Sequence, residues 1–214
     1  MAFRDFRVRF EAMSQIHMQP SPSSYYFINA ITLYRLVSAP FLLLLAAMGQ
    51  QEWFKWLIAF SFFTDAIDGP LSRKYKVTSI FGSKLDSVAD DATVLVSTMA
   101  LWIIQPHFFL ENWMIVAGLL ALFGIQGVAA LIAYKKVTSF HTCLAKTAAV
   151  AQAGFFITAF FGFQFSRGLF VLATFITAAQ LIEEIVLVIL LPEWKTDVKG
   201  IYWVLRSRKR NHSF

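Results

Sequence analysis

The sequence is poor in cysteine and in charge. Cys143 is the single cysteine among 214 residues, which excludes an internal disulfide and a metal site built from several cysteines. Only 15% of the residues are charged, whereas a soluble globular domain carries about 25%. A signal peptide is not expected, because Arg4, Arg7 and Glu11 interrupt the first residues and leave no continuous apolar core. No internal repeat and no low-complexity segment is present, so one domain is expected.

Apolar residues are abundant instead. They make up 57% of the chain, and the mean hydropathy is +0.59. They also form runs of the ~20 residues that cross a membrane as a helix. A soluble domain of this length could not bury so much apolar surface. The sequence therefore predicts an all-α integral membrane protein with six spans, at roughly Ala30–Met48, Trp53–Asp68, Ser83–Ile104, Trp113–Tyr134, Ala145–Phe163 and Gly168–Leu191.

Basic residues predict the orientation of these spans. The net charge of +6 would suggest nucleic acid in a soluble protein. Here the lysines and arginines lie between and beyond the apolar runs, where anionic lipid head groups explain them better. They gather before the first span, after the second, after the fourth and after the sixth, so both termini are expected in the cytoplasm. The chain is therefore predicted to consist of three segments: an amphipathic, interfacial stretch at 1–24, a six-helix catalytic domain at 25–192 and a basic cytoplasmic tail at 193–214.

Four aspartates flank the junction of the second and third predicted spans. Asp65 and Asp68 are three residues apart at the end of one span, and Asp86 and Asp90 are four apart at the start of the next. Such spacings place each pair on one helix face. A short loop makes the two helices antiparallel neighbours, so all four carboxylates are expected to converge on the cytoplasmic side.

The convergence of four carboxylates predicts a metal centre. Like charges at ~4 Å repel by several kcal/mol, which divalent cations would relieve. Oxygen ligands without histidine or cysteine favour Mg²⁺, Mn²⁺ or Ca²⁺ over zinc, and paired ions hold phosphoryl groups during in-line displacement. Gly69 and Gly82 allow close approach of a ligand to the backbone, and Arg73 can donate to diphosphate oxygens. The alternative is that these acids are surface charges paired with nearby lysines and arginines.

The pattern D-x2-D-G-x3-R-x8-G-x3-D-x3-D, which begins at Asp65 and ends at Asp90, resembles the signature of the CDP-alcohol phosphotransferase family. Every spacing matches. The one departure is Ser72, where the family usually has alanine, and it puts the position of the nucleotide in doubt. Two weaker similarities lie outside the signature, in the segment from Asn29 to Arg35 and in the pair Lys146-Thr147.

This resemblance implies a membrane enzyme of phospholipid synthesis. It would transfer a phosphatidyl group from CDP-diacylglycerol to an alcohol and release CMP, with two Mg²⁺ or Mn²⁺ ions, as a homodimer. Asp90 would be the general base and would also touch a metal. The implied site residues are, for metal, Asp65, Asp68, Asp86 and Asp90; for the nucleotide and diphosphate, Gly69, Arg73, Gly82, Asn29 and Thr32; and for the acceptor, Lys84, Lys135 and Lys146.

The acceptor is less well specified than the family. Lys146-Thr147 resembles a pair found in the branch that uses glycerol 3-phosphate, although Cys143-Leu144 departs from the residues that usually precede it. Inositol phosphate, serine, choline and phosphatidylglycerol stay open as acceptors, and either a bacterial inner membrane or an organelle membrane is possible. A divalent-cation transporter is the rival function. It would require acids at mid-membrane in several spans and would leave the glycines and Arg73 unexplained.

Four further ionisable residues lie within or beside predicted spans. Arg35 is expected either to extend toward the membrane surface or to pair with an acid. Asp91 points about 100° away from Asp90 around a helix, which favours a supporting role. Glu183 and Glu184 are adjacent in the sixth span and cannot share a face, so packing, interface and water-pocket roles stay open for them.

Overall fold

The apolar runs fold into seven helices over the described residues. The computed structural model describes residues 22–74, 80–135, 140, 142–164, 166–191 and 198–211. Within its helices it leaves out the side chains of residues 22–29, 31, 68–74, 80, 81, 83, 84 and 207–211. The helices are α2 (Pro22–Ala47), α3 (Gln51–Lys74), α4 (Ile80–Ile104), α5 (Pro106–Tyr134), α6 (Cys143–Phe160), α7 (Ser166–Leu190) and α8 (Ile201–Asn211).

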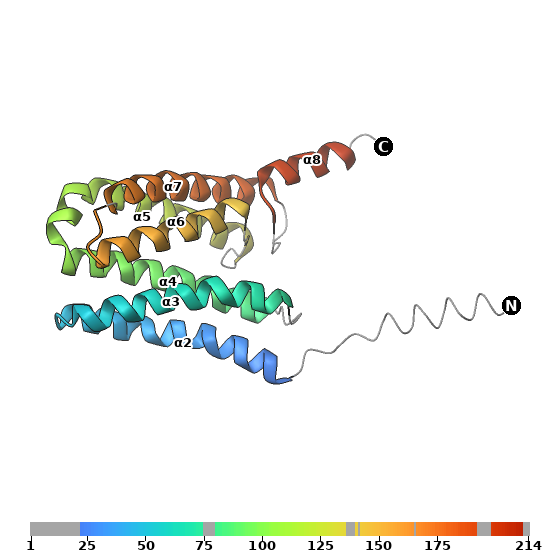
Figure 1. The fold of residues 1–214 in the computed structure, drawn as a ribbon. Coiled ribbons are helices and arrows are strands. Elements are labelled where there is room, and N and C mark those ends of the chain that lie inside the picture. The colour runs from blue at the N-terminus through green and yellow to red at the C-terminus, as the bar shows by residue number, and fades with distance from the viewer. Residues whose placement is uncertain are drawn as a thin grey trace.

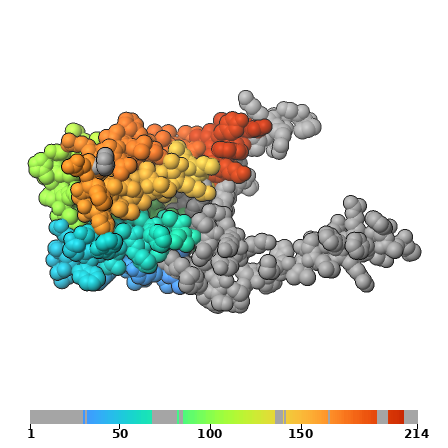
Figure 2. All heavy atoms as spheres, viewed as in Figure 1, coloured from blue at the N-terminus to red at the C-terminus, as the bar shows by residue number. Residues whose placement is uncertain are grey.

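The six long helices form two groups of three (Figure 1). In one group α2 packs against both α3 and α4, and in the other α7 packs against both α5 and α6. Contacts of α4 with α5 and of α3 with α6 join the groups. Spheres of α3 accordingly lie against those of α6 in the space-filling view (Figure 2). Helix α8 leaves the bundle at the end of α7.

Four of the six predicted spans are confirmed as helices long and apolar enough to cross a membrane: Leu85–Ile104, Pro106–Tyr134, Cys143–Phe160 and Ser166–Leu190. In α2 the apolar segment found over the described residues is the shorter Thr32–Ala47. Large apolar side chains cover the outside of the bundle. Ile132 and Ile189 are 78% and 77% exposed, an arrangement that suits a surface facing lipid rather than water.

Three helix boundaries differ clearly from the predicted spans. Helix α2 begins at Pro22 rather than near Ala30. Helix α5 begins at Pro106 rather than near Trp113, because proline suits the first turn of a helix, where its missing N–H is not needed. Helix α3 continues past Asp68 to Lys74. The residues of the signature up to Arg73 therefore lie on a helix, and the link between α3 and α4 is confined to 75–79.

Phenylalanines hold the two groups together at the end where α3 begins. The rings of Phe54 in α3 and Phe160 in α6 meet edge to face with centroids 4.8 Å apart, and the ring of Phe62 in α3 stacks on that of Phe156 in α6 with centroids 6.2 Å apart. Aromatic pairs at such separations are favourable beyond the area they bury. The opposite end, where α3 ends and α4 begins, is hereafter called the acidic end, since it carries the aspartates.

The predicted terminal segments are described only in part. Residues 1–21 of the N-terminal stretch lie outside the described residues, and α2 already begins at Pro22. In the tail, α8 places Ile201 and Val204 against the core residues Ala130, Phe140 and Leu187. Its Tyr202, Trp203 and Leu205 are exposed, so apolar side chains of α8 also lie outside its contact with the core.

Candidate active site

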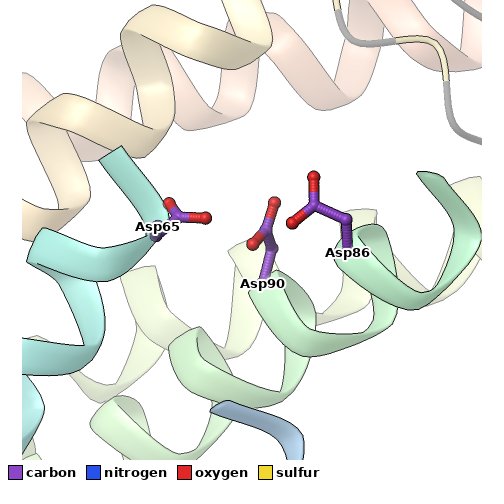
Figure 3. Close-up of side chains that lie close together, drawn as sticks. All are labelled: Asp65, Asp86 and Asp90. Carbon is purple, nitrogen blue, oxygen red and sulfur yellow. The ribbon is translucent and has the colours of Figure 1, made fainter. Parts of the chain in front are cut away.

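Three aspartates meet at the acidic end. Asp65 comes from α3, and Asp86 and Asp90 come from successive turns of α4. Each offers one carboxylate oxygen, and these oxygens lie within 4.8 Å of one another. Figure 3 shows the three carboxylates directed into a common space. The three residues are called the acid cluster below; the side chain of Asp68, the fourth predicted member, lies outside the described residues.

Arg35 of α2 contacts every member of the acid cluster. Its Nη1 lies 2.6 Å from Oδ1 of Asp65 and 3.4 Å from Oδ1 of Asp86. Its Nη2 donates a 2.6 Å hydrogen bond to Oδ1 of Asp90. The side chain is 1% exposed. Of the two alternatives left open by the sequence, pairing with acids is therefore the one observed.

Packing and electrostatics explain this position of Arg35. Helix α2 lies against both α3 and α4, so one of its side chains can reach acids on both. Two carboxylates ~4 Å apart repel by about 4 kcal/mol at an effective dielectric of 20. A guanidinium relieves that repulsion better than an ammonium would, because its planar fork presents several donors at fixed angles.

A cavity of about 290 Å³ opens beside the acid cluster and extends between the two groups of helices. Arg35, Asp65 and Asp90 line it at the acidic end, and Phe155 and Phe170 line it at the aromatic end. Most of its wall is apolar. The cavity therefore combines a charged mouth with a depth suited to groups that avoid water.

Glu184 forms a second polar centre in the same cavity. It is 8% exposed and accepts hydrogen bonds from Gln126 Nε2 at 2.8 Å and from Gln180 Nε2 at 2.7 Å. These three residues are called the Glu184 network. Asp91 lines the same cavity. Sequence reasoning missed the two glutamines; the available signal was a polar amide within an otherwise apolar run, which usually has a buried partner.

The neighbouring Glu183 has a different role, at the start of α8. Its Oε1 accepts a 3.2 Å hydrogen bond from the backbone N–H of Ile201. Gly200, with φ of 141°, brings the chain so close that an added Cβ would stand 2.9 Å from that same oxygen. The two adjacent acids thus face different partners, as the sequence required, and Glu183 joins α7 to α8.

The other predicted site residues divide into three groups. Thr32 is buried in α2, and Gly82 lies half-buried on α4, four residues before Asp86. The predicted acceptor residues Lys135 and Lys146 are exposed at the acidic end of the bundle. Neither of them lines the cavity. The remaining predictions fall on helical residues whose side chains lie outside the description: Asn29, Asp68, Gly69, Arg73 and Lys84.

Known proteins resemble this chain over the region that contains the site. A CDP-diacylglycerol–glycerol-3-phosphate 3-phosphatidyltransferase of Cereibacter sphaeroides is 32% identical over 131 residues, which cover 58% of each chain. A protein of the same name from Sodalis glossinidius is 36% identical over 92 residues, covering 40% of this chain and 46% of the relative. These matches therefore span about half the length of the relatives. No solved structure matches the chain significantly. Residues 26–191, which contain the whole acid cluster, match the CDP-alcohol phosphatidyltransferase family, and the chain belongs to that family.

Proposed function

We propose that this chain transfers a phosphatidyl group from CDP-diacylglycerol to a small alcohol in the membrane, releasing CMP. The observation that carries the proposal is the acid cluster. Three carboxylate oxygens lie within 4.8 Å of one another, at positions of the family signature and inside the segment that matches the family. The cluster also borders a cavity large enough for a small substrate.

The acid cluster has the chemistry of a site for Mg²⁺ or Mn²⁺. Its donors are carboxylate oxygens contributed by two helices, and hard divalent cations prefer such ligands. Asp65, Asp86 and Asp90 would hold the ions together with Asp68, and two ions are expected. When bound, the ions would neutralise charge on the diphosphate and on the departing CMP.

Asp90 is the residue we assign as general base. It would accept the proton of the acceptor hydroxyl while that oxygen forms a bond to the lipid-side phosphorus. The bond from this phosphorus to the oxygen of CMP breaks, and the electron pair leaves with CMP. A base must first lie within reach of the incoming hydroxyl. Asp90 suits this requirement because it belongs to the acid cluster and also lines the cavity.

The remaining signature residues would hold the donor lipid. Gly69, Gly82 and Arg73 would accommodate the nucleotide and diphosphate, with Asn29 and Thr32 of α2 beside them. Thr32 is buried one turn before Arg35, which supports a place close to the acid cluster.

Glycerol 3-phosphate is the acceptor we propose. The two relatives described above carry glycerol 3-phosphate in their names, and the pair Lys146-Thr147 points the same way. Lys84, Lys135 and Lys146 would attract its phosphate at the acidic end. Because Lys135 and Lys146 are exposed and lie off the cavity wall, they suit a phosphate held at the mouth better than one held deep inside.

We further propose six spans with both termini and the acid cluster on the cytoplasmic side, in a bacterial inner membrane or an organelle membrane, as a homodimer. Cys143 is exposed at the start of α6 and is the single cysteine of the chain. A membrane-impermeant thiol reagent should label it only after cells are opened. Labelling in intact cells would contradict the proposed orientation, provided that the thiol also reacts in opened cells.

The activity is tested by supplying purified protein with CDP-diacylglycerol, Mg²⁺ and one alcohol at a time. CMP release should be fastest with glycerol 3-phosphate. Release with serine or inositol phosphate but not with glycerol 3-phosphate would change the acceptor and leave the transfer reaction in place. Absence of release with every alcohol, from protein shown to be folded, would contradict the proposed function.

A further inference from the structure

The buried guanidinium of Arg35 contacts the same three carboxylates that would hold divalent cations. We propose that Arg35 is an internal counter-ion: it holds the acid cluster together until divalent cations bind, and then gives way to them. The proposal rests on the metal centre proposed above. It makes Arg35 a positioning residue, which sets how tightly and in what order divalent cations bind to the acid cluster.

The geometry of the contacts supports competition. All three contacts of Arg35 are to Oδ1 atoms, and a carboxylate oxygen of each of the same residues belongs to the candidate metal group. A divalent cation bound to these oxygens would stand next to the guanidinium, and the two positive charges would repel each other. At 1% exposure, the guanidinium has almost no solvent to screen that repulsion.

The charges around the cavity give Arg35 a second role. It is the only lysine or arginine among the described residues that line the cavity, where Asp65, Asp90, Asp91 and Glu184 supply the acids. Among these residues Arg35 therefore supplies the positive charge as long as no other cation is bound. Its Nη2 also donates to Oδ1 of Asp90 at 2.6 Å, on the carboxylate proposed to accept a proton. Displacing Arg35 would free that oxygen, so metal binding and activation of the base would occur together.

The test compares wild-type protein with Arg35→Gln, which removes the charge, and Arg35→Lys, which keeps it on a single nitrogen. Arg167→Gln is the matched control, because Arg167 forms a 2.9 Å ion pair with Glu111 but is 74% exposed and lies on the first turn of α7, far from the acid cluster. Two quantities are measured on each detergent-purified protein: Mn²⁺ affinity, from the free-ion EPR signal, and the melting temperature in EDTA and in Mn²⁺.

We expect Arg35→Gln to bind Mn²⁺ at least about fivefold more tightly than wild type, because a competing cation is gone. In EDTA its melting temperature should fall by several degrees, since the acids are left unbalanced, and Mn²⁺ should restore most of that loss. Arg35→Lys should have an intermediate Mn²⁺ affinity, and Arg167→Gln should match wild type in both measurements.

A purely structural role for Arg35 predicts the opposite sign, because disordered carboxylates would bind Mn²⁺ more weakly. The proposal is overturned if folded Arg35→Gln binds Mn²⁺ no more tightly than wild type; should that variant not fold, the same criterion applies to Arg35→Lys. If neither wild type nor any folded variant binds Mn²⁺, the metal centre itself is contradicted, and the proposal fails with it.

Discussion

The two groups of helices treat buried carboxylates in opposite ways. In the α2–α4 group, the acid cluster is balanced by a cation, with Arg35 at 2.6 Å from both Asp65 and Asp90. In the α5–α7 group, Glu184 is satisfied by neutral amides, those of Gln126 and Gln180. Both arrangements lie in one cavity, so the difference comes from the partners and not from the surroundings.

This difference separates exchangeable charge from fixed polarity. A cation that balances carboxylates can be replaced by another cation, which is what a metal-dependent site requires. Amides orient a carboxylate without neutralising it, so the hydrogen bonds of the Glu184 network hold α5 and α7 in register. We therefore expect substitutions in the acid cluster to change metal binding and turnover, and substitutions in the Glu184 network to change stability.

The largest effect is expected for Asp90→Asn, with its neighbour Asp91→Asn as control. Both residues lie on α4 and line the cavity, but only Asp90 belongs to the acid cluster. General-base contributions are typically ~10²–10⁴-fold. CMP release by Asp90→Asn should fall at least that far while binding of CDP-diacylglycerol survives, and Asp91→Asn should lose less than about tenfold. An equal loss in both variants would contradict the assignment of Asp90 as the general base, and a larger loss in Asp91→Asn would move the base to Asp91.

The next largest effect concerns metal affinity and compares the two groups directly. Asp65→Asn removes a charged oxygen ligand, so its Mn²⁺ affinity should fall by about tenfold or more. Excess Mg²⁺ or Mn²⁺ should partly restore its turnover. Glu184→Gln should change Mn²⁺ affinity by less than about twofold, because the Glu184 network lies outside the acid cluster. Parallel Mn²⁺ titrations decide the matter, and equal weakening in both variants would mean that the acid cluster is not the metal site.

The stability of the protein should instead depend on the Glu184 network. Glu184→Leu removes the acceptor of two amide donors, the buried Gln126 and the half-buried Gln180, and loss of a buried partner costs about 1–3 kcal/mol. The control is Glu111→Leu, which breaks an ion pair with the exposed Arg167 and should cost less than about 1 kcal/mol. Thermal unfolding in detergent gives both values. A Glu184→Leu variant as stable as wild type would show that the Glu184 network does not hold α5 to α7.

The most local effect is expected at the α7–α8 junction. Gly200→Ala places a Cβ 2.9 Å from Glu183 Oε1 on a backbone with φ of 141°, which should cost about 1–3 kcal/mol locally. Amide exchange in α8 should accelerate while the rest of the bundle is unchanged. Gly154→Ala in α6 is the control, because an added Cβ there meets nothing within 4 Å. Unchanged exchange in Gly200→Ala would mean that α8 is not held through Glu183.

The sequence was most informative where short spacing decides geometry. Asp86 and Asp90 are four residues apart and had to share a helix face. Apolar runs long enough to cross a membrane predicted the four confirmed spans. The identity of the family followed from seven fixed positions at the spacing of its signature, and the match over residues 26–191 confirms it.

Partners that are distant in sequence could not be predicted in the same way. Arg35 lies 55 residues from Asp90, and Gln126 lies 58 from Glu184, so their pairing depends on how whole helices pack. Helix ends were also missed. A proline such as Pro106 can stand either in a loop or in the first turn of a helix, and the sequence alone does not decide between the two. The predicted acceptor lysines rested on sequence position, and whether Lys135 and Lys146 touch a substrate stays a prediction.

The central claim is that the acid cluster uses divalent cations to transfer a phosphatidyl group. It is tested most directly by following CMP and lipid product together, with purified protein, CDP-diacylglycerol and glycerol 3-phosphate. Both products should form in equal amounts, only with Mg²⁺ or Mn²⁺ present, and EDTA should stop their formation until the metal is restored. Product formation that persists in excess EDTA, or CMP released without transfer of the phosphatidyl group to glycerol 3-phosphate, would contradict it.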